Sequence, residues 1–238
     1  MKKQTIRFRP SKKFAENLQT QPVIAVSKIP EWYKKMPKFL NDKVKIPTVN
    51  ENSNLTLKMC PPFLDAMISG YIITLPFDIW VNEENSSQPR FLWEAGGPDY
   101  VEMHSIDQYP GLKIPKEFSE NAYKFNTTHI IETPLEYSLL ITHPFNIIDL
   151  PFLSFSGVVD SDKYNILPIN IPFLIKKDFV GIIEKGTPIA QILPIKRERW
   201  SHVVEKYDQN KSEFAILDLK STIIRSYKNR WWNKKIYE

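Results

Sequence analysis

Proline is the residue that most constrains this 238-residue chain, which contains nineteen prolines but only seven glycines. Proline has no backbone N–H and breaks the interior of a helix. Prolines spread through the middle of a chain therefore favour short strands joined by extended connections and argue against a helical bundle. Hydrophobic residues make up 42% of the chain, which is enough for a substantial core and too many for a disordered protein.

Two segments near the ends of the chain have helical periodicity. The first follows Pro30, a residue type favoured at the start of a helix, and we expect a short helix within residues 28–40. The second runs over residues 197–230, where we expect a helical C-terminal arm. Its apolar residues recur at positions i, i+3, i+4 and i+7: Trp200, Val203, Val204 and Tyr207.

These patterns predict a mainly β protein in three parts. Residues 1–54 form a basic N-terminal extension, residues 55–195 an antiparallel β core, and residues 196–238 a helical, basic arm. Within the core, β-branched and aromatic residues from Gly70 onward and the polar turn at 82–89 predict a hairpin over residues 70–95.

Charge is distributed unevenly between the ends and the middle. Residues 1–49 carry a net charge of +9 and residues 221–238 carry +4, so residues 50–220 carry −8 within a total of +5. Basic ends attract nucleic acid, and Trp231 and Trp232 could stack on bases there. The same ends could instead dock on the acidic body of the same or a neighbouring chain.

The number of cysteines and the spacing of histidines indicate the cellular compartment and whether a metal site is expected. The single Cys60 excludes an internal disulfide and a cysteine zinc cluster, which fits a reducing cytoplasm. The four histidines are too far apart in the sequence for a metal-binding pair. We expect no secretory signal, no membrane span, no metal and no cofactor.

Two turn segments contain the candidate site residues. SGVVDSDKY (156–164) and GTPIAQ (186–191) each contain a glycine that is followed, three to five residues later, by a polar candidate residue, Asp160 or Gln191. Both fit ordinary hairpin turns, in which glycine supplies φ > 0 and aspartate caps the turn.

The same pair resembles the third and fourth motifs of the dUTPase and dCTP-deaminase superfamily, usually G-[VI]-I-D-x-x-Y and G-x-R-I-A-Q. Gly157, Asp160 and Tyr164 match the former in order, with one extra residue before the tyrosine, and Gly186 and Gln191 match the latter. The resemblance implies a dUTPase-like β-clip, a distorted antiparallel barrel. It also implies that the aspartate acts as general base on water and that the tyrosine packs under deoxyribose.

The remaining motifs of that superfamily match less well. Ile72 stands where the magnesium-holding aspartate belongs, and Tyr137 stands at the phosphate-binding arginine, although Ser138 is kept. The glycine-rich fifth motif is missing, because no glycine follows Gly186. We therefore expect no standard dUTP hydrolysis. For the deaminase branch, the candidate bases are Glu132 and Glu136, which also fit solvent-facing strand positions.

Residues 29–200 also resemble a group of uncharacterised tailed-phage proteins, through segments such as IPEWYKKMP (29–37) and SGVVDSDKY (156–164). That resemblance carries no activity and implies a host-cytoplasm location. The superfamily resemblance implies a homo-oligomer, because such folds form trimers in which motifs from different chains meet.

Three functions remain open: binding of a nucleotide or similar small molecule, a protein-interaction or assembly module, and nucleic-acid binding through the basic ends. The expected ligand-binding residues are Asp160, Tyr164, Gln191, Ser138, Gly157 and Gly186, with Asp160 also the candidate catalytic residue.

Overall fold

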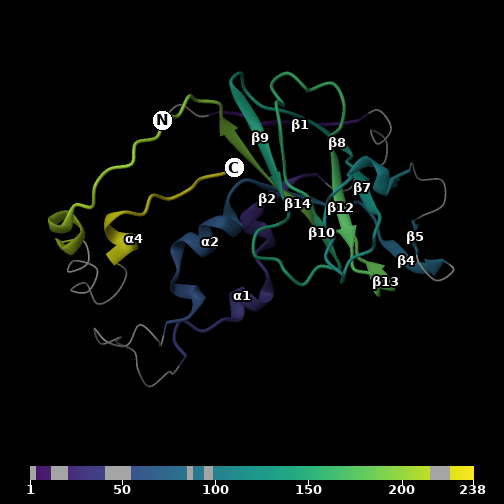
Figure 1. Ribbon diagram of the computed structural model, residues 1–238, viewed down its shortest axis with the longest axis horizontal. Helices are drawn as coiled ribbons and strands as arrows, with labels where there is room; N and C mark the ends of the chain where they lie inside the picture. Colours follow the sequence, from purple (N-terminus) through teal and green to yellow (C-terminus); the bar gives the residue numbers. More distant parts are fainter. Residues whose placement is uncertain (1–3, 12–20, 41–54, 85–87, 94–98, 215–225) are drawn as a thin grey trace. The chain divides into compact units, whose positions relative to one another are not determined.

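The computed structural model describes residues 4–11, 21–40, 55–84, 88–93, 99–214 and 226–238 (Figure 1). The chain divides into two compact units, one formed by residues 1–28 and 70–197 and the other by residues 29–69 and 198–238. The described strands lie in the first unit and the described α-helices in the second. Compared with the expected three parts, residues 1–28 belong with the strands and residues 55–69 with the helices.

The described part of the first unit contains fourteen strands, most of them three to six residues long, as expected for a proline-rich chain. In chain order they are β1 (Arg7–Pro10), β2 (Val23–Ile24), β3 (Tyr71–Thr74), β4 (Ile79–Glu84), β5 (Gln88–Leu92), β6 (Val101–His104), β7 (Ala122–Asn126), β8 (His129–Glu132), β9 (Tyr137–Thr142), β10 (Phe152–Ser154), β11 (Gly157–Val159), β12 (Asn170–Ile175), β13 (Gly181–Ile183) and β14 (Pro188–Lys196).

The strands pair in antiparallel fashion into sheets ordered β1-β8, β10-β12-β7-β6, β11-β9-β14-β3-β2 and β13-β4-β5. With 34% strand against 17% helix, the prediction of a mainly β protein is confirmed. The described strands do not close into a barrel. The five-stranded sheet ends at β11 and β2, which do not pair with each other.

The five-stranded sheet has an apolar centre that is buried on both faces. In β14, Ile189, Ala190 and Ile192 are fully buried, and all four residues of β3 are buried. A strand covered on both sides carries a continuous hydrophobic run in place of an alternating one. In the neighbouring four-stranded sheet, Phe125 of β7 stacks on Phe173 of β12 with ring centroids 3.9 Å apart.

The hairpin expected over residues 70–95 needs correction, because residues 70–84 form two strands in place of one. β3 ends at Thr74 and belongs to the five-stranded sheet, whereas β4 begins at Ile79 and pairs with β5 in the three-stranded sheet. Pro76 lies between them and has no N–H to donate to a ladder. Only β4 and β5 therefore form the predicted hairpin.

The second unit contains α1 (Glu31–Lys35), α2 (Pro61–Ile68) and α4 (Ser226–Arg230), with a further helical turn at 209–214. Pro61 and Pro62 occupy the first turn of α2, where the missing N–H costs nothing. Tyr33 of α1 is buried and stacks on Phe63 of α2, with ring centroids 5.9 Å apart.

The helix expected from residue 197 does not begin there, and residues 198–208 have no regular structure. In Figure 1 this stretch leaves β14 as a plain yellow-green trace. Its apolar side chains remain exposed, and so short a helix is marginal in water unless an apolar face is packed. Residues 215–225 of the predicted arm lie outside the described residues.

The C-terminal tail is fixed to α2 through one buried carboxylate. Asp65 Oδ2 accepts hydrogen bonds from Trp232 Nε1 and Lys235 Nζ, both at 2.7 Å. The ammonium groups of Lys228 and Lys235 also lie over the indole ring of Trp232. These tail residues thus neutralise an acidic group of their own unit.

Gly70, immediately before β3, allows a close backbone approach in the five-stranded sheet. Its φ is +72°, and a Cβ at this position would lie 2.1 Å from the carbonyl oxygen of Ile192 in β14. Gly111 has a similar φ of +86° but no atom within 4 Å of a Cβ.

We predict that Gly70→Ala lowers the free energy of unfolding more than Gly111→Ala does. Gly111→Ala measures the cost of a positive φ alone, about 1–3 kcal/mol, whereas Gly70→Ala adds a backbone collision. Denaturant titration of both variants checks this, and equal losses would contradict the proposed close approach.

Candidate functional site

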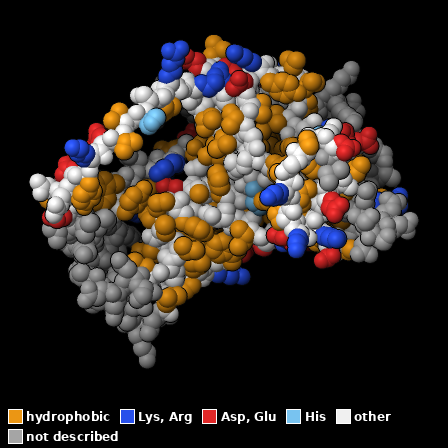
Figure 2. Space-filling model, in the orientation of Figure 1, with side chains coloured by type: hydrophobic (Ala, Val, Ile, Leu, Met, Phe, Trp, Pro, Cys, Tyr) orange, Lys and Arg blue, Asp and Glu red, His pale blue; other side chains and the backbone are white. Residues whose placement is uncertain are grey.

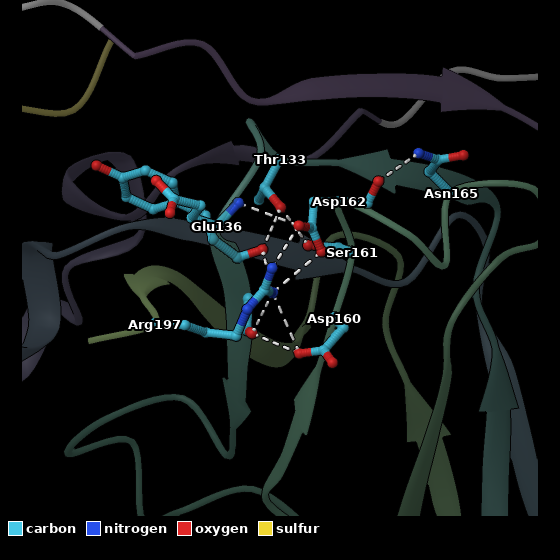
Figure 3. Close-up of polar contacts among 9 residues, drawn as sticks. Thr133, Glu136, Asp160, Ser161, Asp162, Asn165 and Arg197 are labelled. Carbon is cyan, nitrogen blue, oxygen red and sulfur yellow. Dashed lines mark hydrogen bonds and ion pairs between the residues drawn. The ribbon is translucent and has the colours of Figure 1, made fainter. Parts of the chain in front are cut away.

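The candidate site is the turn that follows β11, where two of the predicted residues, Asp160 and Ser138, meet (Figure 3). The carbonyl of Asp160 accepts hydrogen bonds from the N–H groups of Lys163 and Tyr164, at 2.9 and 2.8 Å, which closes the turn. β11 pairs with β9 so that Val159 lies opposite Leu139. This register brings Ser138 beside Asp160, and its hydroxyl donates to Asp160 Oδ1 at 2.6 Å.

Arg197 joins this turn from a third strand. β14 pairs with β9, and one residue beyond it the Arg197 N–H donates to the Glu136 carbonyl at 2.8 Å. The Nη1 atom lies 3.0 Å from Ser138 Oγ and 3.3 Å from Asp160 Oδ1. It also donates to Asp162 Oδ1 at 3.0 Å, while Nη2 donates to Asp162 Oδ2. The guanidinium therefore binds Asp162 with both nitrogens and also contacts Asp160.

Asp162 is the most enclosed acid of the turn, with a side chain only 2% exposed. Hydrogen bonds from Arg197, supported by the N–H of Glu136 at 3.1 Å, lower the pKa of the Asp162 carboxyl from its ordinary value. In return, the carboxylate raises the pKa of Arg197. Both groups therefore stay charged, and the bidentate pair holds the turn against β9 and β14.

Further polar contacts fix the two sides of the turn. The Thr133 hydroxyl donates to the Tyr137 carbonyl at 2.9 Å and lies 2.6 Å from the buried Ser161 hydroxyl. Asn165 Nδ2 donates to the Asp162 carbonyl at 3.0 Å. Glu136 has a φ of 69°, an uncommon conformation that aims its N–H at Asp162.

Gln191 and Gly186 lie away from this turn within the chain. Gln191 is 1% exposed, and its Oε1 accepts the N–H of Phe145 at 2.9 Å. Gly186 precedes β14 whereas Arg197 follows it, a separation of up to about 36 Å at ~3.3 Å per residue. We expected the Gln191 side chain to lie beside Asp160. Within one chain it does not, because Gln191 is buried in the sheet opposite Ile72. A role for Gln191 and Gly186 in a site shared between chains stays a prediction.

The other predicted residues lie at or near the turn. Tyr164 ends it and is 44% exposed. Gly157 begins β11, and a Cβ at this position would meet no atom within 4 Å. Of the two candidate deaminase bases, Glu132 accepts from Arg7 and pairs with Arg9, both at 3.2 Å, and Glu136 contributes backbone groups to the Arg197 cluster.

Residues at and near the first motif, which matches the superfamily poorly, make contacts that belong to the fold itself. Ile72, at the magnesium position of the resemblance, is buried opposite Gln191. Asp78 accepts the N–H of Lys185 at 2.6 Å. In the part of the chain that the structure describes, no three His, Cys, Asp or Glu residues are grouped so that they could hold a metal ion.

Arg197 is the residue that the sequence analysis missed. Its only signal is a basic run, KRERW, after the last strand. The pairing of β9 with β14 places Arg197 beside Ser138, because Tyr137 lies opposite Lys196. These two strands are distant in the sequence, so local patterns do not reveal the pairing.

Comparison with models of known protein families and with curated proteins finds no match. Among the described helices, none has the length and apolar character needed to cross a membrane.

We predict that Asp162→Asn makes the melting temperature less sensitive to acid. Because Arg197 holds the pKa of Asp162 below its ordinary value of 3.8, the pair stabilises the fold fully above that value. This stabilisation is lost as pH falls through the lower folded-state pKa. Thermal unfolding from pH 7 to pH 2 should show a smaller drop for Asp162→Asn than for the wild type.

Two variants act as controls for this pH series. Asp178→Asn changes an exposed acid and should leave the acid response of the wild type intact. Arg197→Met leaves the enclosed carboxylate without its cation, so it should destabilise the protein at pH 7 more than Asp162→Asn does. The opposite order would show that the ion pair does not hold the turn.

Proposed function

We propose that this protein has a dUTPase-like β-clip fold and binds the nucleoside part of a nucleotide at the turn Asp160–Tyr164, without hydrolysing it. The proposal rests on one observation. The carboxylate of Asp160 is fixed in place yet 56% exposed, and the half-exposed Tyr164 lies on the same turn. This pair corresponds to the aspartate and tyrosine of the third motif in the resemblance.

The exposed carboxylate of Asp160 suits a ligand that donates hydrogen bonds. Its Oδ1 is occupied by Ser138 and Arg197, whereas the second oxygen has no contact with the residues drawn in Figure 3. That oxygen can accept from a sugar hydroxyl or a base N–H. The ring of Tyr164 offers an apolar face four residues along the chain. A nucleoside supplies both the donors and the flat apolar surface.

The charges of the cluster disfavour a role in holding phosphates. Asp160 and Asp162 offset the charges of Arg197 and of Lys163 in the same turn, so the cluster has no net positive charge for a phosphate. The resemblance places an arginine beside Ser138 on phosphate, but Tyr137 stands there, and the guanidinium beside Ser138 is already bound to Asp162. Binding is therefore proposed through the nucleoside and not through a triphosphate.

Hydrolysis is disfavoured for a related reason. A general base needs a carboxylate that readily takes a proton from water. The Ser138 hydroxyl and the Arg197 cation both contact Asp160 Oδ1, which leaves only one carboxylate oxygen to take a proton from water.

An assembly role is the second candidate, and the exposed apolar residues between 198 and 208 favour it. Nucleic-acid binding through the tail is less well supported, since Trp232 and Lys235 are engaged by Asp65.

We predict that thymidine or deoxyuridine raises the melting temperature about as much as the corresponding nucleotides do. A ligand at 100 times its Kd stabilises the fold by about 2.7 kcal/mol. Thermal-shift assays on the full chain test this. Asp160→Asn and Tyr164→Ala should remove the shift, whereas Asp178→Asn should keep it. A shift that needs a triphosphate would refute the nucleoside site.

We also predict that the protein with dUTP and magnesium releases no pyrophosphate above background. A coupled pyrophosphate assay measures this directly, with an active dUTPase as the positive control. Turnover in the ordinary enzyme range, about 1–10³ s⁻¹, would contradict the account.

A further inference from the structure

The helical unit carries the entire net charge of the protein. Residues 29–69 and 198–238 contain fifteen Lys and Arg residues and ten Asp and Glu residues, a net charge of +5, which is the value for the whole chain. The strand unit contains seventeen of each kind, and Figure 2 shows basic side chains, in blue, interspersed with acidic ones, in red, around β4 and β13. A partner with many negative charges is therefore attracted to the helical unit.

The C-terminal tail, residues 226–238, concentrates this charge. It contains one acid, Glu238, and four basic residues: Lys228, Arg230, Lys234 and Lys235. The bonds from Trp232 and Lys235 to Asp65 take these two side chains out of any binding surface. They also fix how the tail is turned, because Asp65 belongs to α2 and is only 8% exposed. The other side chains of the tail are thus presented from a fixed position within their own unit.

Two aromatic side chains of the tail lie together on a face distinct from the one that Asp65 binds. The N–H of Trp231 donates to the carbonyl of Tyr227 at 3.0 Å, which continues the helical turn of α4 by one residue. Residues four apart share one face of a helical turn. Tyr227 and Trp231 therefore lie side by side, and they are 40% and 46% exposed. Lys228 and Trp232 share the neighbouring face, which is the one held by Asp65.

Two cations flank this aromatic face. Each residue turns a helix by about 100°, so Lys228 lies on one side of the face and Arg230 on the other, and both are exposed. Lys234, which follows Trp231 by three residues, is exposed as well. Proteins that bind single strands without sequence preference stack bases on aromatic rings and neutralise the phosphates with basic groups. A double helix keeps its bases stacked on one another, so the aromatic face fits a single strand.

We propose that the tail, residues 226–238, binds single-stranded nucleic acid without reading its sequence. Bases stack on the two aromatic rings, and phosphates contact the three exposed cations: Lys228, Arg230 and Lys234. This function goes beyond the proposed nucleoside site, because it belongs to the other unit and uses none of that site's residues. Either one can therefore fail without the other.

The full wild-type chain provides the first test, in an anisotropy titration of fluorescein-labelled oligothymidine of about 20 nucleotides. At about 50 mM salt we expect saturable binding that quenches tryptophan fluorescence. Three phosphate contacts, at about 0.7 per contact, predict that the logarithm of the binding constant falls with the logarithm of salt at a slope near −2. A duplex of the same length should bind at least fivefold more weakly. No binding up to about 100 µM protein, or equal affinity for the duplex, would overturn the proposal.

The second test compares substitutions in the tail with matched ones elsewhere in the same unit. Trp231→Ala should weaken binding about tenfold because a stacked base loses its ring, whereas Trp231→Phe should stay within about threefold of the wild type. Trp200→Ala removes an 87% exposed tryptophan outside the tail and should change the affinity less than twofold. Lys234→Gln should reduce the salt slope by about 0.7, and Lys206→Gln should not. Because all these side chains are exposed, melting temperatures should match the wild type. Equal losses for Trp231→Ala and Trp200→Ala would contradict the site.

Further measurements separate a nucleic-acid strand from other anionic partners and from the nucleoside site. Heparin is negatively charged but has no bases, so its binding should be insensitive to Trp231→Ala. If oligothymidine binding is equally insensitive, the tail binds polyanions only and the proposal is wrong. Phosphatidylcholine vesicles with about 30% phosphatidylserine should bind more weakly than oligothymidine, and a higher membrane affinity would overturn it.

The nucleoside site is tested separately on the same full chain. Asp160→Asn should leave oligothymidine binding intact, and Trp231→Ala should leave the thermal shift produced by thymidine intact. Loss of oligothymidine binding in Asp160→Asn would place the strand at the nucleoside site and contradict the tail proposal. Loss of the thymidine shift alone bears on the nucleoside site and not on the tail.

Discussion

The bidentate pair between Asp162 and Arg197 connects three strands that are far apart in the sequence. Arg197 follows β14, Asp162 follows β11, and the Glu136 N–H before β9 bonds to the same carboxylate. Because the side chain of Asp162 is almost fully enclosed, the loss of either partner would leave an unpaired charge in a poorly hydrated position. The exposed carboxylate of Asp160 is held in place by this arrangement.

The same pair lies at the end of the strand unit. The unit boundary falls between Arg197 and Glu198, directly after the guanidinium is fixed. Up to that point, β14 is held by β9 and β3, with Gly70 permitting the close passage of the Ile192 carbonyl. Beyond it, residues 198–208 have no regular structure and carry exposed apolar side chains. The hydrogen-bonded cluster around Arg197 and a segment without regular structure are thus adjacent in the chain.

Local patterns in the sequence were sufficient to predict a mainly β protein and the pairing of the strands on either side of the polar turn at 82–89. The expectation that Ser138 and Asp160 share a site came from the superfamily resemblance. Local patterns failed where a long-range contact decided the outcome. Gln191 resembled a ligand-binding residue, but its amide satisfies the Phe145 N–H inside the sheet. The period of residues 200–207 predicted a helix, but these residues form none and their apolar side chains are exposed. Arg197 escaped notice because only the β9–β14 register places it in the turn.

The central claim is that Arg197 keeps Asp162 ionised and thereby holds the turn that presents Asp160. The most direct measurement is a carbon-detected NMR titration of the Asp162 carboxyl in the full chain. The account predicts a pKa below the ordinary aspartate value of 3.8. A pKa at or above that value, in protein that remains folded, would contradict it.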